Sequence, residues 1–440
     1  MSFTKYLKYK PSGVEWLDTI PIHWSIIRNK NVFKEINKLS LNGKETLLTV
    51  SHITGVTPRS EKNVNMFFAE TMEGYKLCQN GDLIINTMWA WMGALGTSRY
   101  QGICSPAYNV YRNINGIDYN HQYFDYLFRT PNFVIEMTRL SKGIVESRLR
   151  LYPKDFFRIQ TPIPPLPEQI VIVDYLFQKS TAIERKVALL EQKITHYQQL
   201  RKSLINETVC RGLDKNVKLK ESGIEWIGMI PEHWEINRLK SLGEIETSSV
   251  NKKIEENEGL VKLVNYTDIY NNSLKEIWNN DNFMVVSANL KQLKSKKLRT
   301  GDVLFTPSSE TVEDIGVSSV VMEDLNNTLY SYHILRFKFS KRMHLNFKKY
   351  MLNNDFVQYY FSKSSSGTTR KILGINTFYN LPILFPPTIE EQISIASYLD
   401  EKTQKIDSII TNIKSQIEML KELRKTLIND VVTGKIKVTA

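Results

Sequence analysis

Two basic stretches of this 440-residue sequence carry the residue types that bind phosphate. Each lies near the end of one copy of an internal repeat, and Arg148 and Arg370 occupy matching positions 222 residues apart. Equivalent arginines in otherwise different segments favour a contact with a nucleic-acid backbone, which carries no sequence information. A solvated basic loop is the alternative. The candidate phosphate-binding residues are Lys142, Arg148 and Arg150 in the first copy and Lys363, Arg370 and Lys371 in the second.

Positions that differ between the two copies are better candidates for contacts with bases. Bases are read at their groove edges, so side chains that read different targets should themselves differ. Such polar or charged side chains occur in both copies, within the segments that match least. The candidates are Arg59, Lys62 and Arg99 in the first copy and Lys296, Lys297 and Glu310 in the second.

The motifs that DNA-modifying enzymes need are missing from the sequence. The two Pro-Pro pairs follow Ile163 and Phe385, whereas an adenine methyltransferase needs Asn or Asp there. No Gly-rich cofactor loop follows a strand, and neither Gly43-Lys44 nor Gly434-Lys435 belongs to a P-loop. The Pro-Asp pair of many nucleases is absent, and seven scattered histidines and three cysteines form no zinc-type cluster. We therefore expect no catalytic residue, no metal and no cofactor on this chain.

The charge is concentrated in two long segments. Twenty basic side chains face thirteen acidic ones in residues 1–160, a net charge of +7, and residues 214–385 carry +3. Residues 161–213 carry +2 and residues 386–440 carry none. Phosphate backbones attract such surfaces, although solubility alone would also explain them. The sequence has no signal peptide, no apolar run of membrane-spanning length and no CxxC pair, so we expect a cytoplasmic protein.

The sequence contains an internal duplication. Ser12-Gly13-Val14-Glu15-Trp16 returns as Ser222-Gly223-Ile224-Glu225-Trp226, and His23-Trp24 returns as His233-Trp234. Later matches drift slowly in spacing, from 210 to 223 residues, as expected of a tandem duplication. They include Gly81-Asp82 with Gly301-Asp302, Tyr108 to Arg112 with Tyr332 to Arg336, Pro164 to Ile170 with Pro386 to Ile393, and Leu200 to Glu207 with Leu423 to Asp430.

The best-matched segments predict two long helices. Glu168 begins a stretch without proline or glycine that ends at Gly212, and the second copy has an equivalent stretch. About 40 helical residues span roughly 60 Å. Apolar residues with 4-3 spacing, interrupted at Arg201 and Arg424, predict a coiled-coil seam between the copies; a helix packed only on its own domain is the alternative. The seam residues are Ile183, Val187, Leu190, Ile194, Tyr197, Leu204, Ile406, Ile410, Ile413, Ile417, Leu420 and Leu427.

The poorly matched segments predict α+β domains. Short apolar runs such as Leu83 to Asn86 and Val317 to Met322 alternate with polar loops, as strands do. Gly81-Asp82 and Gly301-Asp302 are expected to be turns before buried strands. His23 and His233 are expected to be packing residues.

The doubled motifs resemble those of the specificity subunits of type I restriction–modification systems over essentially the whole chain. The resemblance rests on the Ser-Gly-Val/Ile-Glu-Trp and His-Trp motifs that open each copy, and on the Pro-Pro to Asn206 and Pro-Pro to Asn429 segments. It implies an α+β fold with two globular target-recognition domains, two long antiparallel helices and pseudo-twofold symmetry. The predicted boundaries are 1–163 and 214–385 for the recognition domains and 164–213 and 386–440 for the helical segments.

The resemblance also implies a function and partners. It implies a non-catalytic subunit that reads a bipartite, asymmetric double-stranded DNA target. Its partners would be two modification (methyltransferase) subunits and restriction subunits, which would carry S-adenosylmethionine, ATP and Mg²⁺. A coiled-coil adaptor without DNA binding and a stand-alone DNA-modifying enzyme remain the alternatives.

Overall fold

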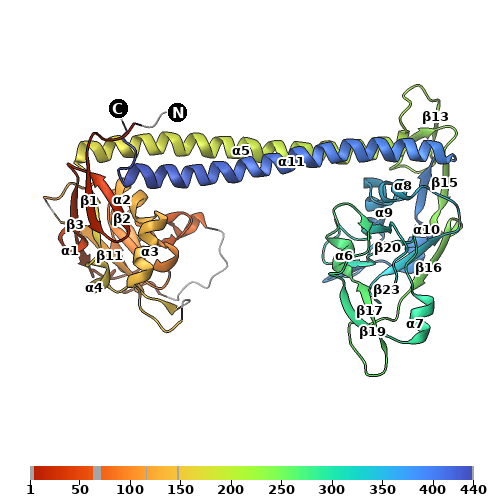
Figure 1. Ribbon diagram of the computed structural model, residues 1–440, viewed down its shortest axis with the longest axis horizontal. Coiled ribbons are helices and arrows are strands. Elements are labelled where there is room, and N and C mark those ends of the chain that lie inside the picture. Colours follow the sequence, from red (N-terminus) through yellow and green to blue (C-terminus); the bar gives the residue numbers. More distant parts are fainter. Residues whose placement is uncertain (1–3, 63–70, 115, 146–147, 439–440) are drawn as a thin grey trace. The chain divides into compact units, whose positions relative to one another are not determined.

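The computed structural model describes residues 4–62, 71–114, 116–145 and 148–438. Contacts group the chain into two units (Figure 1). The first unit combines Met1–Glu191 with Lys414–Ala440, and the second unit is Gln192–Ile413. The four segments predicted from the sequence follow the order of the chain, whereas these units each take part of both long helices.

The first unit is built on a four-stranded antiparallel sheet. The order of its strands is β4 (Phe33–Ile36), β11 (Tyr108–Asn113), β8 (Leu83–Asn86) and β9 (Leu95–Thr97). Its central strand β8 (Leu83–Asn86) is buried along its whole length. Leu83 and Ile85 pack against the aromatic side chains of α2 and α3, while Ile84 contacts a second apolar cluster. An uninterrupted apolar run is what a strand covered on both faces requires.

The remaining elements of the first unit are short. They are β1 (Tyr9–Val14), β2 (Leu17–Pro21), β3 (Ser25–Arg28), α1 (Asn29–Val32), β4 (Phe33–Ile36), β5 (Leu48–Ser51), β6 (Gly55–Pro58), η1 (Arg59–Glu61), β7 (Lys76–Cys78), η2 (Ala90–Met92), β9 (Leu95–Thr97), β10 (Gly102–Cys104), β11 (Tyr108–Asn113), α2 (His121–Phe128), α3 (Pro131–Leu140), α4 (Pro153–Phe156) and β12 (Gln160–Ile163).

The second unit repeats this plan. The strands of its main sheet lie in the order β16 (Gly243–Thr247), β24 (Leu335–Phe339), β20 (Val303–Phe305), β22 (Ser318–Val321) and β18 (Glu276–Ile277). The first four strands correspond in order and direction to those of the first unit. The additional strand β18 pairs in parallel with β22. The central strand β20 (Val303–Phe305) is again fully buried. The duplication inferred from the sequence is therefore visible in the fold, and the predicted α+β class is confirmed.

The other elements of the second unit are also short. They are β13 (Leu219–Glu221), β14 (Met229–Pro231), β15 (Glu235–Arg238), η4 (Leu239–Ser241), β16 (Gly243–Thr247), β17 (Gly259–Val264), α6 (Tyr266–Tyr270), β18 (Glu276–Ile277), β19 (Met284–Ala288), α7 (Leu290–Ser295), β21 (Ser308–Ser309), β22 (Ser318–Val321), β23 (Thr328–Tyr330), β24 (Leu335–Phe339), α8 (Leu345–Leu352), α9 (Asp355–Ser364), β25 (Lys371–Ile372), α10 (Ile375–Asn380) and β26 (Pro382–Phe385).

Two long helices, α5 (Leu166–Arg211) and α11 (Ile389–Val432), confirm the predicted pair of long helices. Within each unit a segment of α5 lies beside a segment of α11 and runs in the opposite direction (Figure 1). Gly212 and Gly434 follow the helices with φ of +72° and +77°, the left-handed conformation that ends helices at low cost. No helix in the described part of the chain has the length and apolar run needed to cross a membrane.

The helix segments contact each other through the spaced apolar residues and through one ion pair in each unit. In the first unit Ile183, Val187 and Leu190 are half-buried, while Ile417 is buried and Leu420 half-buried. In that unit Arg424 pairs with Glu184 at 2.8 Å. In the second unit Ile406, Ile410 and Ile413 are buried, Ile194, Tyr197 and Leu204 are half-buried, and Arg201 pairs with Asp407 at 3.2 Å.

Candidate nucleic-acid interface

The start of each long helix is joined to its own unit by a carboxylate. Glu168 Oε2 accepts hydrogen bonds from His23 Nε2 at 2.8 Å and Trp24 Nε1 at 3.1 Å, and Glu168 Oε1 accepts one from Tyr6. An anion is also favoured in the first turn of a helix.

The second unit repeats the arrangement. Glu391 accepts from His233 and Trp234, both at 2.9 Å. The repeated histidines therefore hydrogen-bond to the carboxylate at the helix start but are exposed, whereas Trp24 and Trp234 beside them are buried. The expectation that the histidines are packing residues is therefore wrong.

The neighbouring glutamines complete this joint. Gln169 is buried, donates to the Pro164 carbonyl at 2.9 Å and accepts from the Asn120 backbone amide at 2.8 Å. Gln392 makes the equivalent bonds, to the Pro386 carbonyl at 3.0 Å and from the His344 amide at 2.9 Å. The repeated Pro-Pro to Glu-Gln motif thus serves to fix a helix to a sheet-containing domain.

A third shared feature holds the central strands. Asp82 accepts two hydrogen bonds of 2.8 Å from Arg112, and Asp302 lies 3.5 Å from the buried Arg336. Both pairs lie at the beginning of the central strand, next to Gly81 or Gly301. The loose Tyr-to-Arg match in the sequence therefore reflects a structural ion pair.

The basic stretches lie at the other end of the central strands. The Leu151 amide donates to the Thr87 carbonyl at 3.2 Å, just after β8, and the Leu373 amide donates to the Pro307 carbonyl at 2.8 Å, just after β20. The same backbone bond thus recurs in both units. It fixes each basic stretch beside the loop that leaves its central strand, which we call the exit loop: residues 87–92 in the first unit and 307–311 in the second.

In the first unit the basic residues form an exposed hairpin beside the exit loop. The backbones of Lys142 and Arg150 exchange two hydrogen bonds of 2.9 Å, and both side chains, with Arg148, are exposed. The Lys142 ammonium group lies 3.6 Å from the buried Asp155 carboxylate, so this carboxylate partly neutralises the charge of Lys142. Burial and the nearby Arg59 guanidinium lower the pKa of Lys62. Burial raises the pKa of Tyr108, and the charge of Arg59 opposes this rise. Tyr108 lies at the start of β11, beside the end of β8.

In the second unit the equivalent hairpin joins an aromatic surface. The Arg370 guanidinium lies 6.0 Å from the ring centroid of Tyr266, which stacks on Tyr270 at 5.3 Å. The Lys371 ammonium group donates to the Gly367 carbonyl at 2.8 Å. Glu310 is exposed in the exit loop, and Lys363 lies over the Tyr359 ring at 5.6 Å.

Three predicted base-reading residues lie at the opposite end of the central strands. Arg99 follows Ser98, whose carbonyl accepts from the Gly81 amide at 2.8 Å. Lys296 lies 3.8 Å from Glu246, and the Lys297 carbonyl accepts from Arg336. The structure therefore does not bring these residues together with the basic hairpins, whereas Arg59, Lys62 and Glu310 lie on the hairpin side.

The sequence prediction did not include several side chains at this surface. Tyr332 and His333 have ring centroids 3.8 Å apart. They come just before β24, whose first residue pairs with the last residue of β20, so they lie near the end of β20. Burial, Lys252 and Arg370 together lower the pKa of His333. The match of Tyr332 to Tyr108 was the only sequence signal for this region. In the first unit the exposed Met88 and Trp89 were also not predicted.

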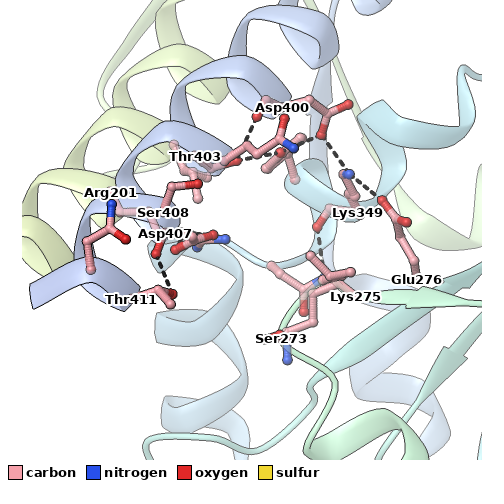
Figure 2. A pocket seen from close by; sticks show the side chains of 16 residues that line it. Arg201, Ser273, Lys275, Glu276, Lys349, Asp400, Thr403, Asp407, Ser408 and Thr411 are labelled. Carbon is pink, nitrogen blue, oxygen red and sulfur yellow. Dashed lines mark hydrogen bonds and ion pairs between the residues drawn. The ribbon is translucent and has the colours of Figure 1, made fainter. Parts of the chain in front are cut away.

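A separate cavity of about 590 Å³ in the second unit is lined by residues of α5, α8 and α11 (Figure 2). The Lys349 ammonium group lies 2.6 Å from both Glu276 and Asp400, and Tyr350 donates to Asp400 at 2.7 Å. These contacts neutralise the buried lysine and fasten α8 to α11. Among the described residues, no three His, Cys, Asp or Glu side chains form a possible metal site.

This fold and its paired basic surfaces define a duplicated α+β protein without a recognisable catalytic cluster in the part of the chain described. Sequence comparison then identifies the relatives. Residues 231–419 match the family described as type I restriction modification DNA specificity domain. The resemblance predicted from the doubled motifs is thereby confirmed.

Two curated relatives are named as specificity subunits of type I restriction enzymes. The MjaVIII specificity subunit of Methanocaldococcus jannaschii is 24% identical over 287 residues, covering 65% of this chain and 64% of that protein. The EcoKI specificity subunit of Escherichia coli is 22% identical over 319 residues, covering 68% of this chain and 62% of that protein. The matches thus span under two thirds of these relatives.

Solved structures confirm the fold. The HsdS subunit of Thermoanaerobacter tengcongensis has a TM-score of 0.56 at 16% identity, with 95% of this chain and 98% of that chain covered. A chain from a study of the assembly and conformational transition of the type I R-M system has a TM-score of 0.68 at 16% identity, with 94% and 98% covered.

Proposed function

We propose that this chain is the DNA-recognition subunit of a type I restriction–modification complex and binds double-stranded DNA. The observation that carries the proposal is the recurrence of one basic hairpin, fixed by the same backbone hydrogen bond, beside an exit loop whose side chains differ between the units. A shared basic contact with unlike neighbours is what phosphate binding combined with different base contacts requires. The names of the curated relatives support the same assignment.

The target is bipartite and asymmetric in this proposal. Each unit reads one half-site, and because the two exit loops are unlike, the half-sites differ. Two uninterrupted helices of 46 and 44 residues begin in one unit and end in the other, and the proposal takes a gap of one length between the half-sites from this continuity of the chain.

The partners are proposed from the likeness to specificity subunits of type I restriction enzymes. Two modification subunits would supply methyl transfer with S-adenosylmethionine, and restriction subunits would supply ATP- and Mg²⁺-dependent cleavage. The chain itself would be non-catalytic. Incubation of the purified chain with a labelled methyl donor and DNA should therefore transfer no label. Transfer by the chain alone would support the stand-alone enzyme.

The decisive experiment is DNA binding measured against salt concentration. Binding should weaken steeply and linearly on a logarithmic scale, because each phosphate contact releases counterions. A coiled-coil adaptor would not be retained on DNA at any salt concentration. Mapping of methylated adenines in a host that expresses the complex would then give the half-sites and their gap.

A further inference from the structure

The two exit loops occupy the same place in the repeated fold, but one carries apolar side chains and the other carries polar and acidic ones. Thr87 and Pro307 accept the equivalent backbone hydrogen bonds, so the residues that follow them correspond. In the first unit these are Met88, Trp89, Ala90 and Trp91, and in the second they are Ser308, Ser309, Glu310 and Thr311. A frame that is kept while the loop changes from aromatic to acidic is suited to reading different bases.

The exit loop of the first unit exposes apolar side chains. Trp89 is 52% exposed, and Met88 and Met92 are also exposed. The neighbouring Trp91 holds the loop, because its indole donates to the Met88 carbonyl at 3.0 Å. Asn86 accepts two further hydrogen bonds, from the Met88 amide at its side-chain oxygen at 3.2 Å and from the Trp89 amide at its backbone carbonyl at 3.0 Å. Exposed tryptophan and methionine in a fixed loop beside arginines indicate a binding surface.

The exit loop of the second unit is fixed by a different device. The Asp314 carboxylate accepts hydrogen bonds from Ser309 at 2.6 Å, from Thr311 and from Tyr270. These bonds hold the residues on both sides of Glu310, whose own side chain is exposed. Glu310 acts electrostatically on both Tyr266 and Tyr270, which places its carboxylate near the tyrosine pair beneath Arg370.

A carboxylate on a phosphate-binding surface costs affinity unless it meets a hydrogen-bond donor. The edges of base pairs in the major groove offer such donors, and the cytosine amino group is the usual partner of glutamate. Tryptophan and methionine side chains offer no carboxylate to accept a hydrogen bond from an amino group. Apolar side chains instead contact the thymine methyl group in the same groove.

We propose that the exit loops are the base-reading elements of the two units. Glu310 accepts a hydrogen bond from a cytosine amino group in one half-site, and Trp89 contacts a thymine methyl group in the other. The inference rests on the proposed function and names the bases that each unit reads.

The test is a binding selection on random double-stranded DNA with the full chain and its variants. Glu310→Gln should reduce the preference for cytosine at one base pair at least about fivefold, the lower end expected for such a contact. Overall affinity should not fall, because a negative charge is removed. The matched control is Glu313→Gln, which removes the same charge from an exposed side chain two residues beyond the exit loop and should leave the preference unchanged.

The first unit is tested in parallel. Trp89→Ala should flatten the preference for thymine at a position in the other half-site. Leu7→Ala is its control, because Leu7 is 99% exposed and lies beside Glu168, at the far end of the sheet from the exit loop.

The outcomes separate the two proposals. If wild-type protein shows no salt-sensitive retention on DNA, the proposed function is wrong and this inference fails with it. If wild type and the Glu310 and Trp89 variants bind DNA and select identical sequences, the proposed function stands and the base-reading inference is wrong. A changed preference in the control variants as well would also overturn it.

Discussion

At the scale of single residues, Arg148 and Arg370 remain the best candidates for phosphate contacts. Each lies in the hairpin that is fixed beside an exit loop, and Arg370 also covers Tyr266. We expect Arg148→Ala and Arg370→Ala to weaken DNA binding about equally for all sequences. Each should lower the magnitude of the salt slope by about one.

The controls for these variants come from the far end of the same sheets. Arg99→Ala and Lys297→Ala remove one positive charge each but lie beside the beginning of the central strands. Their salt slopes should stay at the wild-type value. A changed sequence preference in Arg148→Ala, with affinity intact, would show that this arginine reads bases.

Lys348 makes a residue-scale prediction about pH. Its ammonium group donates to the Gly301 carbonyl at 2.9 Å, and burial lowers its pKa to about 8. Between pH 8 and 10.5 the unfolded chain therefore keeps a proton that the folded chain has released, so the free energy of unfolding rises with pH. Relative to Lys348→Met, wild type should gain on the order of 3 kcal/mol across this window.

Urea unfolding at several pH values would measure this difference. The exposed Lys297→Met serves as the control and should follow wild type at each pH. A constant difference between wild type and Lys348→Met from pH 7 to 10.5 would contradict the lowered pKa.

At the scale of elements, the ion pairs between helix segments predict a charge-swap result. Arg201 and Asp407 in the second unit correspond in the repeat to Arg424 and Glu184 in the first. Asp407→Arg should cost about 1 kcal/mol, as expected for a partly exposed pair that becomes repulsive. Adding Arg201→Asp should restore most of the loss.

The measurement is the midpoint of urea unfolding for the two single variants and the double variant. Glu418→Lys is a suitable control, because Glu418 pairs only with Lys421 on the same helix in the described contacts. If the double variant is no more stable than Asp407→Arg, the two side chains do not interact in solution.

The elements were more predictable from the sequence than their neighbours in space. Long stretches without proline or glycine predicted α5 and α11, and the apolar run from Leu83 predicted β8. The arginine in each seam was also evident. Its acidic partner was not, because the sequence alone does not fix which residues of the second helix face it.

The candidate surface was predicted only in part for a similar reason. Arg148 lies beside an exit loop and Glu310 lies within one. Arg99 and Lys296 lie at the other end of the sheet, although all four are polar loop residues in the sequence. The end of the sheet at which a loop lies depends on how strands that are distant in the sequence pair. Trp89 was missed because an apolar residue after a strand usually belongs to the core.

At the scale of the whole molecule, the continuous helices predict how the DNA target responds to a change in their length. Inserting seven residues into α5 after Lys193 and seven at the facing position of α11 keeps the 3.5-residue repeat. The insertion adds about 10 Å, close to three base-pair steps.

The expected result is a selected target with the same two half-sites and a gap longer by about three base pairs. Glycine-rich insertions of equal length are the control and should give no single preferred gap. An unchanged gap in the helical variant would mean that the helices do not set the separation.

The first unit is not continuous in the sequence, and this affects the order in which the protein folds during synthesis. Its core contains Leu427, Val431 and Val432, the Tyr123 hydroxyl group donates to the Val432 carbonyl at 2.9 Å, and Lys437 pairs with Thr4. The second unit lies wholly within Gln192–Ile413.

A ribosome therefore completes the second unit before it delivers the residues that close the first. At about 5–20 residues per second, the N-terminal segment waits roughly 10–50 seconds with part of its apolar surface uncovered. A chain that stops before Leu427 should accordingly lose its first unit and keep its second. Limited proteolysis of such a chain should degrade residues 4–191 and spare 192–413; protection of the N-terminal segment would show that it folds without waiting.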